Sequence, residues 1–470
     1  MSTGLERDSI SSPLLSSNEV ISKLANLADT PHISLVRSAL GAEEDLYFVG
    51  GTVRDMFWGL DPLDIDFASR LTPGALVEKC ESAGIRIIPT GKRHQTVTVV
   101  PLPGSNSVEI TTFRSAGMSP NSGLVTGSSI EEDLKFRDFS VNALAYSLNG
   151  KQLIGDKESF NDLQSRLLKA VGDPTTRILE DPLRSLRLLR IACEHNLSID
   201  EETFKSTAAN ISLLSGVSAE RIRDELVRII LSPQPGRGMR LLEKSGALKT
   251  ILPEIQEFVG YEQNRFHRLD LFEHTIAVIE NSESDEILRL AALFHDVGKP
   301  PTLSIDAETG DRHFFKHETV GAEIAKAILL RLRFPHSTVD AVTSLIETHM
   351  RPLEAGPGGL RRLLRDVGSE YERWRKLKEA DARGCIFDEN EFAKRIKRFD
   401  EAMAEVKKGP AVSPLKSLAI NGHDVTASGF PPGPQVGIIL RALHEQVLDN
   451  PELNTREQLL SMIDVMVKKN

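Results

Sequence analysis

Two acidic residues that alternate along a short apolar segment are the first features of this sequence that could do chemistry. Asp64 and Asp66 lie in the segment DIDFA, which ends at Ala68 and has the pattern of a strand. Residues two apart on a strand point to the same face, so both carboxylates could hold a hard cation such as Mg²⁺. Glu109, in another predicted strand, is either a third carboxylate of this site or a solvent-facing residue.

A pair of glycines precedes these acids. Gly50 and Gly51 end an apolar run and open a predicted helix, where the backbone can approach a phosphate closely. Arg54, one turn into that helix, could pair with phosphate oxygens, and Asp55 follows it. A glycine turn beside paired carboxylates suggests nucleoside triphosphate chemistry. In such chemistry one cation activates the attacking hydroxyl and another neutralises the leaving pyrophosphate.

A third candidate is a helix that carries a row of arginines. Asp181 can cap this helix, with Pro182 at its first position. Arg184, Arg187 and Arg190 then recur every three residues beside a row of leucines. They form either a solvated arginine face or a surface that reads the edge of a base and grips a triphosphate.

Histidines and aspartates are spread through the region from 266 to 384. Imidazoles and carboxylates on facing helices can build a metal site in a helical bundle, although a single buried histidine is usually structural. Lys299 could offset the charge of a phosphate. The candidate ligands are His274, His295, Asp296 and Asp381, with His317 and His349 as candidates for a second metal.

The elements around these residues predict one mixed head and a long helical body, an α+β chain. Strands are predicted at 46–49, 64–68, 85–89, 96–101 and 108–113, with helices at 53–60 and 73–83. After residue 128 strands become scarce, so the remaining two thirds should be mostly helical. The predicted parts are a flexible N-terminus, a head, a helical neck, a helical body and a helical tail, at 1–25, 26–150, 151–255, 256–400 and 401–470.

The composition predicts a soluble, cytoplasmic protein without a membrane partner. At 470 residues the chain suggests roughly three or four domains. No apolar run reaches the length of a membrane span, and the Ser-rich N-terminus is unlike a signal peptide. A net charge of −10 argues against indiscriminate nucleic-acid binding but permits a local basic surface. Cys80, Cys193 and Cys385 lack the spacing of a zinc site and are expected to pack in the core.

Five motifs in order resemble class II tRNA nucleotidyltransferases and bacterial poly(A) polymerases. They are GGTVRD (50–55), DIDFA (64–68), EEDLKFRDFSVNALAY (131–146), EDPLRSLRLLRIA (180–192) and AERIRDEL (219–226). The resemblance covers about residues 45–400. It implies a polymerase-β-like head, two-metal nucleotidyl transfer with Mg²⁺ at Asp64 and Asp66, and addition of C and A to the tRNA 3′ end from CTP and ATP.

The same resemblance assigns roles to further residues. Asp181 and Arg184 match positions that pair with the incoming base in place of a nucleic-acid template, and Arg187 and Arg190 match positions that contact the nucleotide. Residues of the RDFSVNA motif would hold the ribose, namely Arg137 and Asp138 with Asn142 in support. Helical bodies in this family hold tRNA through its shape and its phosphates.

Three departures from the family pattern leave the product open. The usual Arg-Arg-Asp is Phe136-Arg137-Asp138, the glycine expected after His94 is Gln95, and the loop at 115–129 carries no charged residue. In the family this loop is charged and helps to switch specificity from C to A. The alternatives are therefore an enzyme that adds only CC, one that adds only A, or a poly(A) polymerase.

The region of candidate metal ligands resembles the HD-domain metal-dependent phosphohydrolases, and some CCA-adding enzymes carry this domain. The pair His295-Asp296, with His274 before it and Asp381 after it, matches the HD ligands, and His317 and His349 match those of dinuclear members. The resemblance implies a transition metal, either Mn²⁺, Ni²⁺, Co²⁺ or Fe²⁺. Two further alternatives are a protein that acts mainly as a phosphohydrolase and a non-catalytic RNA-binding protein. The intact DxD and EDxxR motifs argue against the second.

Overall fold

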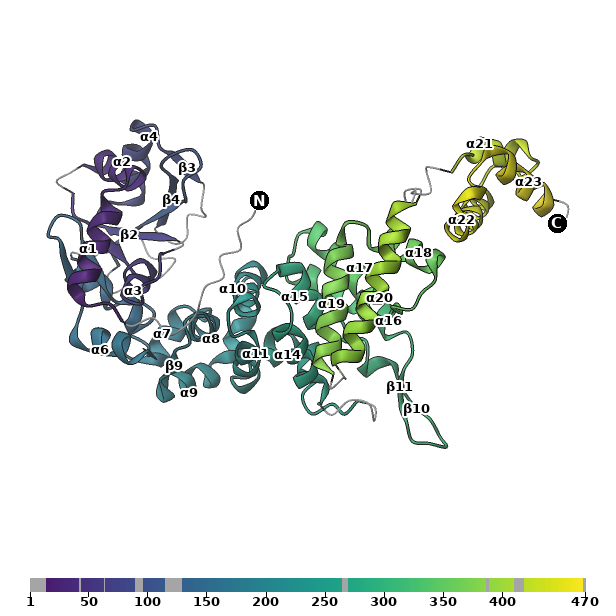
Figure 1. Cartoon of the computed structure of the whole chain (residues 1–470). Coiled ribbons are helices and arrows are strands. Elements are labelled where there is room, and N and C mark those ends of the chain that lie inside the picture. Colours follow the sequence, from purple (N-terminus) through teal and green to yellow (C-terminus); the bar gives the residue numbers. More distant parts are fainter. Residues whose placement is uncertain are drawn as a thin grey trace. The chain divides into compact units, whose positions relative to one another are not determined.

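The chain forms two compact units, with the boundary between Ile251 and Leu252 (Figure 1). The computed structural model describes residues 14–41, 44–62, 64–88, 96–114, 129–263, 269–385, 389–409 and 418–467. Gln95 and the uncharged loop, apart from its last residue Ser129, lie outside these ranges. None of the described helices is long and apolar enough to cross a lipid bilayer.

A mixed sheet of seven strands forms the centre of the first unit, as the α+β prediction requires. The strand order is β3-β4-β5-β2-β1-β6-β7, in which β2 and β5 pair in parallel and all other neighbours pair antiparallel. The strands are β1 Leu46–Val49, β2 Ile65–Ser69, β3 Arg86–Ile88, β4 Thr96–Val100, β5 Val108–Thr112, β6 Ala145–Ser147 and β7 Gln152–Ile154.

The first five strands lie within one residue of their predicted bounds, but β6 and β7 were not predicted. Each of these two strands has only three residues, so neither shows a clear alternation. The Asn149-Gly150 pair between them is a common hairpin signal. With this hairpin, the sheet of the head extends to Ile154 in the sequence.

Two helical layers of different size cover the two faces of this sheet. Helices α1 Ser17–Ala28, α2 Pro31–Leu40, α3 Gly51–Phe57 and α4 Pro73–Ser82 share one large core with side chains such as Phe48, Phe67 and Ile110 (Figure 1). The opposite face has a smaller core that includes Ala68 and residues of α5 Ile130–Leu134. Because side chains alternate along a strand, Asp66 and Glu109 lie on this second face.

Helix α3 begins two residues before the predicted start and ends three residues before the predicted end. Its N-cap is Gly50, in the left-handed region with φ 61°. At the other end Gly59 has φ 71°, and the N–H of Leu60 donates to the carbonyl of Asp55 at 2.9 Å. A glycine with positive φ, together with a backbone hydrogen bond between residues five apart, is a common helix C-cap. The prediction overlooked it.

The described rest of the first unit is mostly helical, as predicted, with two short strands, β8 and β9, that pair in parallel. Helix α8 begins at Arg184, after a turn formed by Pro182 and Leu183, while the Asp181 carboxylate accepts a hydrogen bond from the N–H of Leu183 at 3.2 Å. The remaining elements are α6 Lys157–Ser165, β8 Leu167–Leu168, α7 Pro174–Glu180, α8 Arg184–His195, β9 Ser198–Ile199, α9 Glu201–Ala209, α10 Ala219–Leu231, α11 Pro235–Lys244 and α12 Ala247–Ile251.

The second unit is helical apart from one hairpin. Its last three helices share a small core of their own. The elements are α13 Pro253–Gln256, α14 Leu271–Glu280, α15 Glu286–Phe294, β10 Leu303–Ile305, β11 Arg312–Phe314, α16 His317–Arg331, α17 His336–Thr348, α18 Pro357–Val367, α19 Tyr371–Gly384, α20 Glu389–Lys408, α21 Gly422–Ala427, α22 Pro434–Asp449 and α23 Arg456–Val467.

Candidate active site and metal centre

The strand order of the sheet brings three carboxylates of the head together. The parallel pairing of β2 and β5 places Asp66 directly beside Glu109. Asp64 lies one residue before β2 and is exposed, as is Glu109, while Asp66 is half-buried. Val108 and Ile110, on either side of Glu109, are fully buried on the opposite face. Glu109 therefore shares its face of the sheet with Asp66.

These carboxylates repel one another. Burial raises the pKa of Asp66, and the charge of Asp64 raises it further, while Arg137 opposes the rise. Burial and then the charges of Asp66 and Asp64 raise the pKa of Glu109. A divalent cation among these oxygens would relieve the repulsion, so the donor set fits Mg²⁺. The head carboxylates do not pack tightly together. Among the described residues, groups of three ligand atoms within 4.8 Å of one another occur only in the second unit.

The glycine turn lies against these carboxylates. A Cβ atom at Gly50 would lie 3.6 Å from Asp66 Oδ2 and 3.4 Å from a guanidinium nitrogen of Arg137, and the left-handed φ of Gly50 already favours glycine. A Cβ atom at Gly51 would lie 3.9 Å from the same Asp66 oxygen. The turn therefore leaves room for a ligand to approach Asp66 along the backbone.

Thr52 joins the glycine turn to the acidic strand, a role that the sequence analysis missed. Its side chain is fully buried. The Thr52 hydroxyl accepts a hydrogen bond from the N–H of Asp66 at 2.8 Å and donates to the carbonyl of Asp64 at 3.3 Å. Both predicted metal ligands are thus positioned through their backbone by one hydroxyl. Only its place next to Gly51 could have suggested this role.

Arg54 and Asp55 face the protein interior. The Arg54 guanidinium donates to the carboxylate of Asp55 at 2.9 Å and to the side-chain oxygen of Asn142 at 2.7 Å, and it lies 3.0 Å from His195 Nε2. These contacts occupy much of the Arg54 side chain, which is 8% exposed. Arg54 therefore ties the glycine turn to the RDFSVNA segment and to the end of α8.

The RDFSVNA segment forms a second polar network. Both Nε and NH2 of Arg137 donate to Asp133, a buried acid that the sequence analysis did not single out. Asp138 accepts from Asn142 at 3.0 Å and from Arg187 at 3.0 and 2.7 Å. Although burial disfavours its charge, Arg187 and Asn142 hold the pKa of Asp138 far below its usual range. The four-residue spacing of Asp133 and Arg137, which is typical of ion pairs on helices, could have indicated this contact.

The predicted arginine row of α8 divides into outward-facing and inward-facing members. The Arg187 side chain is 36% exposed, and the Asp181 side chain is 30% exposed and pairs with Arg221 at 2.8 Å. Arg184 pairs with Glu180 at 2.7 Å.

Arg190 lies farther inside. Its side chain is only 6% exposed and pairs with the buried carboxylate of Glu225 at 3.0 Å, while burial lowers its pKa to about 10. Asp181, just before α8, and Arg187 on α8 are therefore the partly exposed members of this group.

In the second unit all six predicted metal ligands lie together. His274 comes from α14, Asp381 from α19, and His295-Asp296 follows α15 directly. His317 begins α16 and His349 follows α17. The four histidines and Asp296 are almost completely buried.

Asp296 lies at the centre of this cluster, and each of its two oxygens faces a different pair of histidines. Oδ2 lies 3.1 Å from His295 Nε2 and 3.4 Å from His274 Nε2. Oδ1 lies 3.4 Å from His317 Nε2 and 3.9 Å from His349 Nε2. Asp381 joins the first group, at 3.4 Å from His274 Nε2. The donors therefore fit two cations that share Asp296.

Backbone carbonyls fix the orientation of three of the imidazoles. The Nδ1 atoms of His295, His317 and His349 lie 2.8, 2.8 and 2.6 Å from the carbonyl oxygens of Ala292, Phe314 and Ile346. A ring that donates from Nδ1 in this way presents an unprotonated Nε2 toward the cluster. That is the tautomer a metal ligand needs, and such outer contacts commonly accompany histidine ligands.

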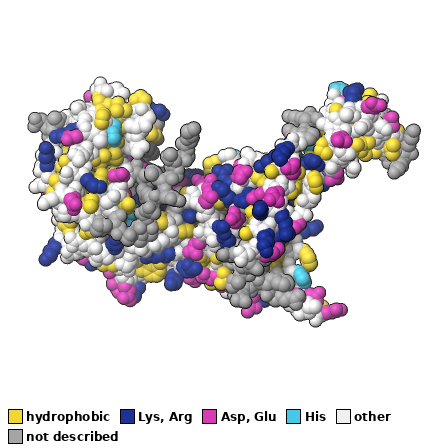
Figure 2. All heavy atoms as spheres, viewed as in Figure 1, with side chains coloured by type: hydrophobic (Ala, Val, Ile, Leu, Met, Phe, Trp, Pro, Cys, Tyr) yellow, Lys and Arg dark blue, Asp and Glu magenta, His cyan; other side chains and the backbone are white. Residues whose placement is uncertain are grey.

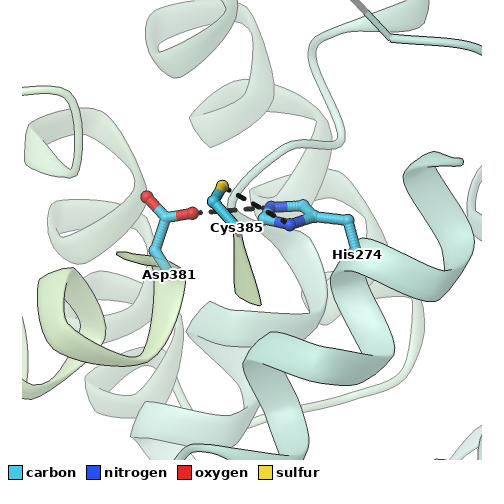
Figure 3. A group of neighbouring side chains, drawn as sticks. All are labelled: His274, Asp381 and Cys385. Carbon is cyan, nitrogen blue, oxygen red and sulfur yellow. Dashed lines mark hydrogen bonds and ion pairs between the residues drawn. The ribbon is translucent and has the colours of Figure 1, made fainter. Parts of the chain in front are cut away.

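His274 is flanked by a thiol instead. Its Nδ1 atom lies 4.0 Å from the sulfur of Cys385, and both residues lie close to Asp381 (Figure 3). Cys80 and Cys193 are buried in the core as expected, but Cys385 is half-buried beside this metal-binding group. The sequence spacing of the cysteines contained no signal for that position.

The charges of the cluster suit metal binding. Burial, and then the neighbouring imidazole of His295, lower the pKa of His349 to about 3, which favours its neutral form. Although burial opposes its charge, His295 and Lys299 hold the pKa of Asp296 well below its usual range, and Lys299 pairs with it at 2.7 Å. Burial opposes the charge of His274 and His317, but hydrogen bonds to Asp296 raise the pKa of both imidazoles, so a metal ion would have to displace protons there.

Family models match successive parts of the chain. They are the poly(A) polymerase head domain at 46–169, the probable RNA and SrmB-binding site of polymerase A at 196–259, the HD domain at 269–387 and the tRNA nucleotidyltransferase domain 2 at 388–463.

Similar proteins of known activity match the chain over most of its length. A CC-adding tRNA nucleotidyltransferase of Thermus thermophilus is 33% identical and aligns over 88% of this chain and 92% of its own. An A-adding tRNA nucleotidyltransferase of Deinococcus radiodurans is also 33% identical, over 84% and 90%. The solved structure of the Bacillus stearothermophilus CCA-adding enzyme in complex with CTP shares the fold, with a TM-score of 0.68 at 22% identity over 94% of this chain and 98% of that chain.

Proposed function

The chain belongs to the family of tRNA nucleotidyltransferases and poly(A) polymerases, and from this premise we propose that it adds C and A to the 3′ end of tRNA from CTP and ATP. The observation that carries the proposal is the placement of Asp66 beside Glu109, against the Gly50-Gly51 turn. Carboxylates that hold divalent cations next to a phosphate-accessible turn are what nucleotidyl transfer requires.

Different residues of the head would have different roles in the reaction. Asp64 and Asp66, with Glu109, would hold Mg²⁺, which when bound lowers the pKa of the attacking hydroxyl and neutralises charge on the leaving pyrophosphate. The hydrogen bonds of the Thr52 hydroxyl hold the backbone of Asp64 and Asp66 next to the glycine turn. Because Arg137 lies beside both Gly50 and Asp66, it can offset phosphate charge there.

The nucleotide itself would be selected by Asp181, just before α8, and by the first turns of that helix. Asp181 and Arg184 offer one acceptor and several donors, a combination that can bind the edge of cytosine or adenine. Arg187 joins this surface to the ribose-binding candidates, because it is held by Asp138, which also binds Asn142. Arg190 would support this surface from the protein interior, through its buried ion pair with Glu225.

The second unit has a surface suited to RNA phosphates. Figure 2 shows lysine and arginine side chains gathered over α19 and α20, with acidic side chains among them. These helices contribute Lys376, Arg383, Lys397, Arg398 and Lys407, among others. Positive charges of this kind bind the RNA backbone without reading its sequence.

We retain the predicted division of the chain into five parts as part of the proposal. We also retain the predicted cytoplasmic location, where nucleoside triphosphates are abundant.

A CC-adding enzyme is the second candidate for the product. It is supported by the absence of charged residues from 115–129, and by the similarity to the CC-adding relative. The two candidates differ only in the last nucleotide, so they share every residue placed above.

The product can be determined by supplying labelled nucleotides to the purified protein. With tRNA that lacks its CCA end, CTP and ATP together should extend the RNA by three nucleotides, and CTP alone by two. A tRNA that ends in CC should receive one A. If that tRNA stays unextended, the protein adds only CC; if only that tRNA is extended, it adds only A; a long A tail on either would indicate a poly(A) polymerase.

Thr52 provides a test of how the head carboxylates are positioned. Replacing Thr52 with Val keeps the shape but leaves the buried N–H of Asp66 without its partner, at a cost of roughly 1–3 kcal/mol. We expect kcat for nucleotide addition to fall about tenfold or more. Thr52→Ser retains the hydroxyl and should keep most of the activity. Equal losses in the two variants, measured by steady-state incorporation, would contradict this role.

For the second unit we propose metal-dependent hydrolysis of a phosphoester. The cluster supports this proposal because its oriented Nε2 atoms and its central Asp296 can hold two cations, either Mn²⁺, Ni²⁺, Co²⁺ or Fe²⁺. Lys299, paired with Asp296, adds a positive charge for a phosphate.

A further inference from the structure

The β10–β11 hairpin exposes apolar and aromatic side chains between two segments that carry metal ligands. It follows the His295-Asp296 segment and leads directly into α16, which begins at His317. Phe315 is 71% exposed and Ile305 is 61% exposed. Side chains of this size are rarely left in water without a use when they gather at a site.

The exposed ring of Phe315 forms a flat stack with the half-buried ring of His313. The rings of His313 and Phe315 lie 5.3 Å apart with an interplanar angle of 13°. On the same hairpin the ring of Phe314 lies 6.4 Å from Tyr261, and the Arg312 guanidinium lies 5.9 Å from the Tyr261 ring. The outer face of Phe315 is open to a third flat group, such as a nucleobase.

The hairpin is joined to both halves of the metal-binding cluster. The carbonyl of Phe314 lies 2.8 Å from His317 Nδ1, and the ammonium of Lys299 lies 5.7 Å from the centre of the Phe314 ring while pairing with Asp296. Lys316, between Phe315 and His317, has a left-handed φ of 62°, a strained conformation for lysine. Phe315 lies two residues before His317, so their Cα atoms are at most about 7 Å apart, about the length of one nucleotide.

We propose that Phe315, supported by His313, is a stacking platform for the unpaired base at the 3′ end of an RNA whose terminal phosphate enters the HD cluster. This inference rests on the hydrolase activity proposed above and names its substrate class. With a terminal 2′,3′-cyclic phosphate, water adds its oxygen to phosphorus, one ring P–O bond breaks, and the released ribose oxygen takes a proton from that water.

The charges near the platform favour RNA over an apolar protein partner. Lys316 is exposed next to Phe315 and would attract phosphates, while Arg312 is held by the carbonyl and the carboxylate of Glu262. The acidic residues of the hairpin lie in its turn, where Asp306 accepts hydrogen bonds from the N–H groups of Glu308 and Thr309. The platform is therefore the end of the hairpin nearest to α16.

Phe315→Ala in the full-length protein separates base recognition from phosphate chemistry. The two substrates are adenosine 2′,3′-cyclic phosphate and glycerol 1,2-cyclic phosphate, which has the same cyclic phosphate but no base. We expect KM for the adenosine substrate to rise about tenfold and KM for the glycerol substrate to stay unchanged. Phe315→Trp should restore the adenosine KM. Leu330→Ala, an exposed apolar residue on α16, is the matched control.

Each other outcome has a defined meaning. If Phe315→Ala changes both substrates equally, or neither, the platform is refuted while the hydrolase proposal stands. If the wild-type protein loaded with Mn²⁺, Ni²⁺, Co²⁺ or Fe²⁺ hydrolyses neither substrate, the hydrolase proposal fails and takes the platform with it. If the glycerol substrate is preferred, the apolar patch serves another partner, such as a protein.

Discussion

Asp66→Asn is expected to reduce nucleotide addition by about a hundredfold to a thousandfold while leaving the head folded. The substitution keeps the size of the side chain but removes a charge that a divalent cation needs, and loss of one such electrostatic interaction typically costs about 10²–10³ in kcat. Folding should not suffer, because burial and Asp64 already disfavour the charge of Asp66. The Thr52 contact uses the backbone of Asp66 and remains.

The measurement is incorporation of labelled CTP into tRNA that lacks its CCA end, together with a thermal melt. Glu131→Gln, which removes an exposed carboxylate from α5, is the matched control and should retain full activity. Full activity of Asp66→Asn would refute the assignment of this site. Glu109→Gln decides between the two interpretations of Glu109, because a mere solvent-facing residue would lose little activity.

Much of the fold of the head could be predicted because four of its first five strands have four or five residues and the other, β3, lies in the apolar segment 85–89. The strands β6 and β7 are too short for that signal, and the Asn149-Gly150 turn between them had to be recognised instead. Strand order was not predictable from periodicity. The parallel pairing of β2 with β5 turns Glu109 from an isolated acid into the neighbour of Asp66.

The site was predictable where residue type alone decides the chemistry, and less so where burial decides it. Three equally spaced arginines look alike in the sequence, yet Arg187 is partly exposed while Arg190 is enclosed beside Glu225. Arg54 has the expected place one turn into α3, but its contacts with Asn142 and His195 come from residues far along the chain. Such long-range partners leave no local pattern.

The HD cluster shows the same limit in another form. The six ligands were identified from their types and the HD pair, and the structure brings all six together. Neither the sharing of Asp296 between two histidine pairs nor the position of Cys385 beside His274 follows from spacing. Both depend on how α14, α15, α17 and α19 pack. The sharing of Asp296 leads to the second large prediction.

Asp296→Ala should remove both metal ions from the second unit, whereas His349→Ala should remove only one. Asp296 offers one oxygen to His274 and His295 and the other to His317 and His349, so its loss opens both sites. His349 belongs to one site only. The Mn²⁺ bound by the second unit, measured above any that the head carboxylates retain, should therefore fall from about two ions per chain to none in the first variant and to one in the second.

Hydrolysis of adenosine 2′,3′-cyclic phosphate should fall by at least about a hundredfold in Asp296→Ala, since catalysis by paired cations is lost with them. Addition of nucleotides to tRNA should continue, because the head supplies its own carboxylates. His336→Ala, an exposed histidine on α17, controls for loss of any imidazole from that helix. If Asp296→Ala and His349→Ala retain equal amounts of metal, the cluster does not hold two ions through a shared aspartate. If all three variants bind as much metal as the wild type, the buried histidines are structural, and the second unit serves the enzyme as a scaffold.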